Sequence, residues 1–185
     1  MALLPSAFKI ARAELINNSN ETTSESRSLI VRSRKTNGQR FEFNIESVSY
    51  EPQDIKPLMG FFAGVKQSLD VVTFTLPVFS ESTCPNKTVN GARVAGTTTV
   101  AVTSGTGVQV GDYFNFSNHG KAYIVTSISG NTITFAPNLT TNVPNGAIII
   151  FNGCTFTCRL RRGPFSFMAD SNQSATINLD VYEAL

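Results

Sequence analysis

The single histidine of the chain is the first candidate for a catalytic residue. His119 stands between Asn118 and Gly120, a combination typical of a tight turn between two strands. General acid–base or nucleophilic catalysis needs a reactive group held by an orienting partner. The carboxylates are scattered, no G-x-S-x-G motif occurs, and Asp112 begins a strand, where it would bond turn amides. We therefore expect no enzyme and no catalytic residue.

Phosphate, cofactor and nucleic-acid sites are also not expected. Ser104-Gly-Thr-Gly107 lacks the lysine and the following helix that a phosphate loop requires. The net charge is only +2, and the 14 phenylalanines fall at strand spacing, which indicates a core rather than a base-stacking platform. The sequence therefore predicts no cofactor and no specific binding of nucleic acid.

The three cysteines raise the question of a metal or a disulfide. Cys154 and Cys158 lie four residues apart on one predicted strand, so they share a face but are too far apart for an easy disulfide, and Cys84 stands alone. A zinc site would need a fourth ligand, and only one histidine exists. We expect buried thiols that pack as small apolar groups, with no metal.

A few other side chains are candidates for contacts with partners. Arg159 and Arg161 share a strand face beside Arg162, and they form either a solvated face or an ion-pairing surface for a neighbouring subunit. Phe61 falls off the apolar stripe of a predicted helix, so it packs at the edge of its own core or reaches a neighbouring chain. Tyr113 and Tyr123 are the tyrosine candidates for stacking on a sugar.

Composition favours a β-rich protein with broad contact surfaces. Hydrophobic residues make up 41% of the chain and charged residues 15%, so few charges need to be desolvated when a surface is buried. The N-terminal 20 residues lack the continuous apolar stretch of a secretory signal, and no segment is apolar enough for a membrane helix. We expect synthesis and folding in the cytoplasm, without membrane insertion.

The periodicity of apolar residues predicts two units. Residues 13–29 are polar and turn-rich, so residues 1–28 are expected to form an exposed arm or long loop. A discontinuous domain, residues 29–88 plus 152–185, contains a hairpin that turns at Thr36-Asn-Gly-Gln39, a helix opened by Pro52, and alternating strands. The expected strands outside the hairpin cover 71–78, 154–160 and 175–181.

The region between these halves, residues 89–151, follows a shorter rhythm. Glycine-rich turns separate five expected strands, at 97–102, 113–116, 122–128, 132–135 and 147–151. Five short strands within about 60 residues are typical of a small, partly closed barrel of the SH3 or OB kind. The fold class expected is therefore mainly β: a split β-sandwich with one packed helix, carrying an inserted small β-barrel.

Several of these motifs together resemble the distal tail, or tail-tip, proteins of long-tailed bacteriophages. The resemblance rests on Gly38-Gln-Arg-Phe41, Phe62-Ala63 within the helix, Val72-Thr-Phe-Thr-Leu-Pro77 and the closing strand that ends at Glu183. In the middle region it rests on Val89-Asn-Gly-Ala92, Gly111-Asp-Tyr-Phe114 and Tyr123-Ile-Val-Thr126. Relatives often carry tryptophan where this chain has Phe41. The resemblance implies a tail-tube-like domain assembled as a ring, commonly six-fold.

The function implied is structural. Such a ring joins the tail tube to the tip hub and leaves a channel for DNA, so the expected partners are copies of the chain, the tube protein, the hub protein and the tape measure protein, within the virion. Two other ring proteins, a head–tail joining protein and a tail terminator, remain alternatives. A carbohydrate- or receptor-binding module and a hydrolase built from scattered Asp and Ser are the alternatives outside this class.

Overall fold

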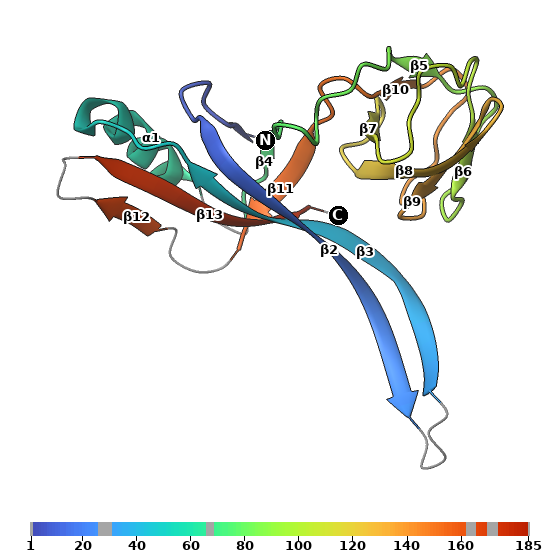
Figure 1. Ribbon diagram of the computed structural model, residues 1–185, viewed down its shortest axis with the longest axis horizontal. Helices are drawn as coiled ribbons and strands as arrows, with labels where there is room; N and C mark the ends of the chain where they lie inside the picture. Colours follow the sequence, from blue (N-terminus) through green and yellow to red (C-terminus); the bar gives the residue numbers. More distant parts are fainter. Residues whose placement is uncertain (1, 26–30, 66–68, 162–165, 170–173, 185) are drawn as a thin grey trace.

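The computed structural model describes the chain except residues 1, 26–30, 66–68, 162–165, 170–173 and 185, and it is mainly β (Figure 1). The first of its two sheets has seven strands in the order β1-β4-β11-β13-β3-β2, with β12 paired to β13. Its strands are β1 (Ala2–Leu3), β2 (Ile10–Glu25), β3 (Val31–Ser47), β4 (Val72–Phe74), β11 (Phe156–Leu160), β12 (Ser166–Ala169) and β13 (Ala175–Glu183). The expectation of a mainly β chain is confirmed.

The second sheet is built entirely from the middle of the sequence. Its six strands run in the order β5-β10-β7-β8-β9-β6. They are β5 (Lys87–Thr88), β6 (Thr99–Ala101), β7 (Tyr113–Phe116), β8 (Ala122–Ser129), β9 (Thr132–Ala136) and β10 (Ile148–Ile150). A bridge between Val89 and Val102 joins the two ends of this order, and Thr103 donates its N–H to the carbonyl of Thr88. All five strands expected here are present, while β5 was missed.

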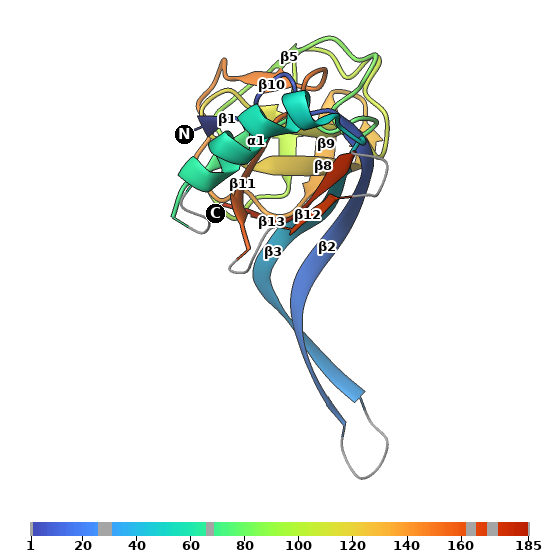
Figure 2. The ribbon, with the colours of Figure 1, turned by 90° about the vertical axis from the view of Figure 1, so that its left-hand side faces the viewer.

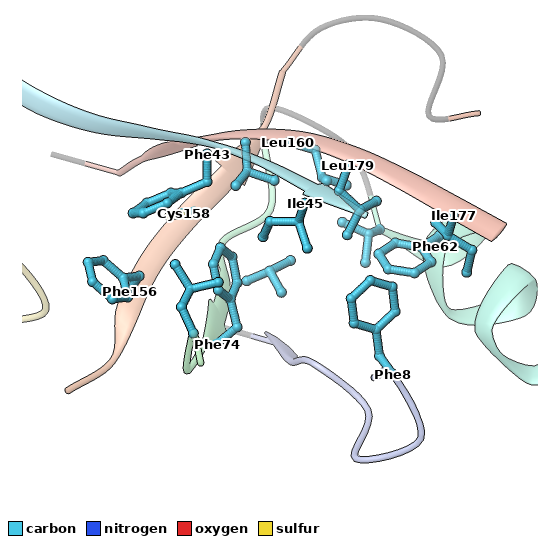
Figure 3. Packing of buried hydrophobic residues seen from close by; sticks show 14 of the residues in the cluster. Phe8, Phe43, Ile45, Phe62, Phe74, Phe156, Cys158, Leu160, Ile177 and Leu179 are labelled. Carbon is cyan, nitrogen blue, oxygen red and sulfur yellow. The ribbon is translucent and has the colours of Figure 1, made fainter. Parts of the chain in front are cut away.

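Strand alternation builds the core beneath the first sheet (Figure 3). Phe41, Phe43 and Ile45 of β3 point to one side and are buried, whereas Asn44 and Glu46 are exposed. Rings meet edge to face across the strands: Phe43 lies 4.9 Å from Phe156 and 6.0 Å from Phe74, centroid to centroid. Edge-to-face aromatic pairs stabilise a core beyond the area that they bury.

Helix α1 (Pro52–Gly64) covers part of this core. Figure 2 shows the helix lying across the first sheet. Pro52 sits in the first turn of the helix, where a missing N–H costs nothing, and Ile55, Leu58 and Phe62 are buried, as predicted. Met59, expected on the same stripe, is instead 41% exposed. Within the described residues, no helix has the length and apolar character needed to span a membrane.

The strand expected over residues 71–78 ends earlier than predicted. β4 stops at Phe74, and Leu76 is still buried, but Val78 is 77% exposed although the alternation placed it inside. Phe79 donates its N–H to the carbonyl of Pro77, which closes a three-residue turn around Val78 with φ at 68°. A β-branched residue at positive φ is strained, because Cβ crowds the backbone. Alternation cannot continue through such a turn.

The arm expected over residues 1–28 is contradicted by the structure. Ile10–Glu25 is a 16-residue strand, paired antiparallel with β3 from Ile10↔Ser47 to Glu25↔Val31. The polar run of residues 17–25 hid it, because such a run carries no apolar alternation and is typical of a loop. The signal that sequence reasoning passed over is Ala13 and Leu15, which alternate and pack against the first core.

The hairpin expected to turn at residues 36–39 is also wrong. β3 runs straight through these residues, and its partner is β2. The pairing shifts register between Ser19↔Gln39 and Glu21↔Lys35, so β3 holds three residues, 36–38, opposite the single residue Asn20. The Asn-Gly pair therefore marks an irregularity within a strand instead of a chain reversal, a second common use of glycine in sheets.

Much of the β2–β3 pair extends beyond the body of the protein. β13 pairs with β3 only over residues 42–46, so the remainder of β3 has β2 as its sole described strand neighbour. Figures 1 and 2 show this two-stranded ribbon leaving the body and running well past both sheets. An isolated two-stranded ribbon is only marginally stable in water.

Replacing Phe156 by alanine tests the aromatic core. The ring is fully buried and meets Phe41, Phe43 and Tyr113 edge to face. We expect the free energy of unfolding to fall by about 3–5 kcal/mol, the range for removing a buried aromatic ring. Urea unfolding followed by circular dichroism measures the change. Val94→Ala, at a site 64% exposed, is the control and should stay within about 0.5 kcal/mol of wild type.

Candidate functional site

The carboxylate of Glu183 lies where the two sheets meet. It ends β13 in the first sheet, and its side chain is fully buried. Oε1 accepts the backbone N–H of Ala122, in β8 of the second sheet, at 2.8 Å, and Oε2 accepts that of Phe41, in β3, at 3.3 Å. One side chain thus holds backbone from both sheets.

Lys121 pairs with this carboxylate. It directly precedes β8, and its side chain is 4% exposed. Nζ bonds Glu183 Oε2, donates to the carbonyl of Gln39 at 3.4 Å and lies 5.0 Å from the centroid of the Phe41 ring. Burial lowers the pKa of Lys121, and the Glu183 charge opposes this; burial also raises the pKa of Glu183 against the pull of Lys121. Both changes favour uncharged groups.

A second polar contact joins the sheets through Asn115 of β7. Its Nδ2 donates to the carbonyl of Thr155 at 2.8 Å, and its Oδ1 accepts the N–H of the same residue at 2.7 Å. The amide side chain therefore imitates a strand partner for the segment that leads into β11. Asn115 is itself buried, so both of its contacts lie away from water, where an unmet hydrogen bond is costly.

The two tyrosines proposed to stack on sugar are not exposed platforms. Tyr113 faces the first core, edge to face with Phe41, Phe79 and Phe156 at 5.7, 5.7 and 5.9 Å. Tyr123 is fully buried in the second core. This corrects the expectation, and the reason is that β7 and β8 turn their aromatic side chains inward, toward both cores.

His119 belongs to a hydrogen-bonded cluster around the Tyr123 hydroxyl. Its Nε2 lies 2.8 Å from that hydroxyl and its Nδ1 lies 3.0 Å from Oδ1 of Asn118, while the Tyr123 hydroxyl lies 3.3 Å from Oγ1 of Thr140. The imidazole stacks on Phe116, and burial, followed by the Lys121 charge, lowers the pKa of His119. Both ring nitrogens serve internal hydrogen bonds that tie a turn to the second core.

Of the arginines proposed as subunit contacts, Arg161 is engaged within the chain. It pairs with Glu42 on β3, and its Nε lies 3.0 Å from Oδ2 of Asp180 on β13. Its side chain remains 46% exposed, on the face of the first sheet opposite the buried phenylalanines. Arg159 donates from Nη1 to the carbonyl of Leu69 at 2.6 Å, and Arg162 lies outside the described residues.

Phe61 is half-buried beside Phe62, with ring centroids 5.3 Å apart, at the margin of the first core. Phe61 therefore packs at the edge of its own core, which was one of the two expectations. Its ring is partly exposed, and a contact with a neighbouring chain stays a prediction. The cysteines are free and buried, as predicted, and burial raises the pKa of both Cys154 and Cys158.

A shallow groove of about 370 Å³ runs beside the chain segments that connect the two sheets. Phe8, Ile10, Leu76 and Pro77 supply apolar walls, and Glu81 is the single carboxylate among its lining residues. A hydrolase built from acids needs two carboxylates that converge. This groove therefore does not supply the site that the hydrolase alternative predicts.

The free edge of β2 is the feature that sequence reasoning missed. The order of the first sheet ends at β2, so the outer side of this strand has no strand partner among the described residues. An unpaired edge presents a row of N–H and C=O groups that can accept another strand. Comparison of the sequence with known proteins adds no assignment: no protein-family model matches the chain, and no curated protein matches it significantly.

The network around Glu42 predicts a pH dependence. The side-chain amide of Asn18 donates a hydrogen bond from Nδ2 to Oε1 of Glu42 at 2.9 Å. This hydrogen bond, together with Arg40 and Arg161, lowers the pKa of Glu42, although burial opposes the change. A carboxylate with a lowered folded pKa contributes stability that is present above its ordinary pKa and is lost as pH falls through the lowered value. We expect Glu42→Gln to lower the free energy of unfolding at pH 7. The difference from wild type should shrink as the pH falls below the ordinary pKa of glutamate, because Glu42 then becomes protonated in the wild type as well.

Urea unfolding at a series of pH values measures this difference. Glu46→Gln, an exposed position four residues further along β3 on the same strand face, is the matched control. Equal losses for the two variants at every pH, or a Glu42→Gln loss that grows in acid, would contradict the role given to the network.

Proposed function

We propose that this chain is a structural protein of the tail tip of a long-tailed bacteriophage. Copies of it form a ring that joins the tail tube to the distal hub and leaves a channel for DNA. The observation that carries the proposal is the long open edge of β2 together with the ribbon that projects from the first sheet. The assignment to a tail tip rests on the sequence motifs that resemble those of distal tail proteins.

The ribbon supports assembly through its energetics. The β2–β3 pairs from Glu21↔Lys35 to Glu25↔Val31 form the distal part of the ribbon. No other described strand of the first sheet pairs with β2 or β3 there. Such a ribbon gains little stability by itself, because among the described residues no third strand pairs with it. A neighbouring copy supplies this strand, and repetition of one contact by rotation closes a ring.

The finer architecture is part of the same proposal. Residues 29–88 plus 152–185 form a split β-sandwich with α1, related to tail-tube proteins, now extended by β2 from residues 1–28. Residues 89–151 form an inserted barrel of the SH3 or OB kind. The bridge between Val89 and Val102, which links the two ends of the second sheet, favours closure. The separate apolar cluster within that sheet favours an insert with its own core.

The exposed face of the first sheet suits the wall of a channel. Glu42, Arg161 and Asp180 lie on this face, where acidic and basic groups are interleaved and paired. A face that carries balanced charge neither holds a polyanion nor repels it strongly, so DNA would pass without binding. Six copies, with the tube protein, the hub protein and the tape measure protein as neighbours, are the assembly proposed for the virion, built in the host cytoplasm.

The insert is assigned a contact with another tail component. Within residues 89–151 the charged residues are Arg93, Asp112 and Lys121, and Lys121 is buried against Glu183. Threonine, serine and asparagine supply most of the other polar residues in this region. A surface with so few charges loses little by desolvation, which favours a protein contact. Tyr113 is half-buried against the first core and Tyr123 is fully buried, so neither supports stacking on a sugar.

Shortening the ribbon tests the proposal. Ser19 and Gln39 lie opposite each other, so replacing residues 20–38 by Asn-Gly closes a two-residue turn and removes only the distal ribbon. We expect the intact protein to form rings and the shortened protein to remain monomeric, because the contact that binds the neighbour is lost. Light scattering coupled to size-exclusion chromatography measures the mass of each.

Circular dichroism and thermal unfolding check that the shortened protein keeps its fold, and Val94→Ser, at an exposed position between β5 and β6, is the control that should assemble normally. Rings of unchanged mass without the distal ribbon would refute its role. Antibody labelling of virions then separates the ring classes: label at the tail tip supports the proposal, and label at the neck assigns the chain to head–tail joining or tail termination.

A further inference from the structure

The buried pair of Lys121 and Glu183 has surroundings that suit a covalent bond. An ion pair withdrawn from water loses several kcal/mol of hydration for each charge, and only good geometry with further hydrogen bonds restores it. Here the Phe41 ring faces Nζ, the thiols of Cys154 and Cys158 lie close enough to interact electrostatically with the pair, and both side chains are within 4% of complete burial. Apart from the N–H groups of Phe41 and Ala122 and the carbonyl of Gln39, these neighbours offer the two charged groups little in place of water.

We infer that Lys121 and Glu183 condense to an isopeptide bond, Nζ to Cδ, with release of one water molecule. This modification is independent of the function proposed above. It would join β13 of the first sheet to the residue preceding β8 of the second, across 62 positions of sequence. The bond replaces two buried charges by one neutral amide.

The first step is a proton transfer within the pair. Nζ passes one proton to Oε2, which gives a neutral amine and a neutral carboxylic acid. The apolar setting favours this state, because burial lowers the pKa of Lys121 and raises that of Glu183. A desolvated neutral lysine is a nucleophile. The carbonyl of Gln39, 3.4 Å from Nζ, accepts one remaining N–H.

The second step is attack on the carboxyl carbon. The lone pair of Nζ forms the new bond to Cδ, and the π pair of the carbonyl moves onto Oε1. The N–H of Ala122, 2.8 Å from Oε1, donates to that oxygen where negative charge develops. A second proton then moves from Nζ to the Oε2 hydroxyl, the C–Oε2 bond breaks, and water leaves. Fixed contact between the two groups supplies the proximity that a reaction between free molecules lacks.

Intact mass spectrometry of the purified, denatured full-length chain is the test. We expect a mass lower than that of the sequence by one water molecule. Trypsin cannot cleave after an acylated lysine, so the digest should contain the fragment 94–159 joined to the fragment 163–185. A mass equal to that of the sequence, with cleavage after Lys121, would overturn the inference and leave a buried ion pair.

Two variants fix the assignment. Lys121→Arg keeps the charge but lacks the primary amine, so its mass should match its sequence, and a persistent loss of water would overturn the assignment to Lys121. Arg161→Lys places an amine beside Glu42 and Asp180 on the exposed face. It should lose only the one water molecule of the wild type. Loss of a second would show that proximity alone suffices and would contradict the role given to burial.

Discussion

The buried carboxylate of Glu183 is the interaction on which the arrangement of the two sheets depends. It receives an N–H from each sheet and contacts Lys121, so groups from two segments of the chain, Phe41 and Lys121–Ala122, are its partners. Separating the sheets would leave these buried polar groups without partners in an apolar setting, which is far more costly than the loss of an exposed contact. The second sheet is therefore held against the first at this point.

Packing around the junction has the same effect. Ala122 is buried with the residues of the first core, and Tyr113 and Ile124, also from the second sheet, pack against that core. The double contact of Asn115 with Thr155 fixes the chain where it returns to the first sheet. These contacts add apolar packing and backbone hydrogen bonds to the junction made by Glu183.

Local periodicity predicted the elements that bury apolar side chains. The alternation of Phe41, Phe43 and Ile45, the helical spacing of Ile55, Leu58 and Phe62, and the short strands of the second sheet are all present. Each of these signals is contained within a few neighbouring residues. The free, buried thiols were predicted from the same local alternation, although Cys154 lies just before β11 and only Cys158 lies on that strand.

The features that were missed depend on residues far apart in sequence. β2 carries polar residues because most of it has no core to cover, so its composition resembles that of a loop. The Asn-Gly pair at residues 37–38 can close a turn or accommodate a strand irregularity, and only the pairing with β2 decides. Lys121 and Glu183 are ordinary charged residues in the sequence, and burial at a junction of distant strands gives them their role.

The open edge of β2 is the basis of the proposed assembly, and amide hydrogen exchange tests it most directly. The exchange rates of residues 10–25 should be measured on the purified protein under dissociating and assembling concentrations. If a neighbouring copy covers this edge, the amides of β2 that point away from β3 will exchange much more slowly in the assembled protein, while those bonded to β3 will change little. Equal, fast exchange of the outward amides at every concentration would contradict the account.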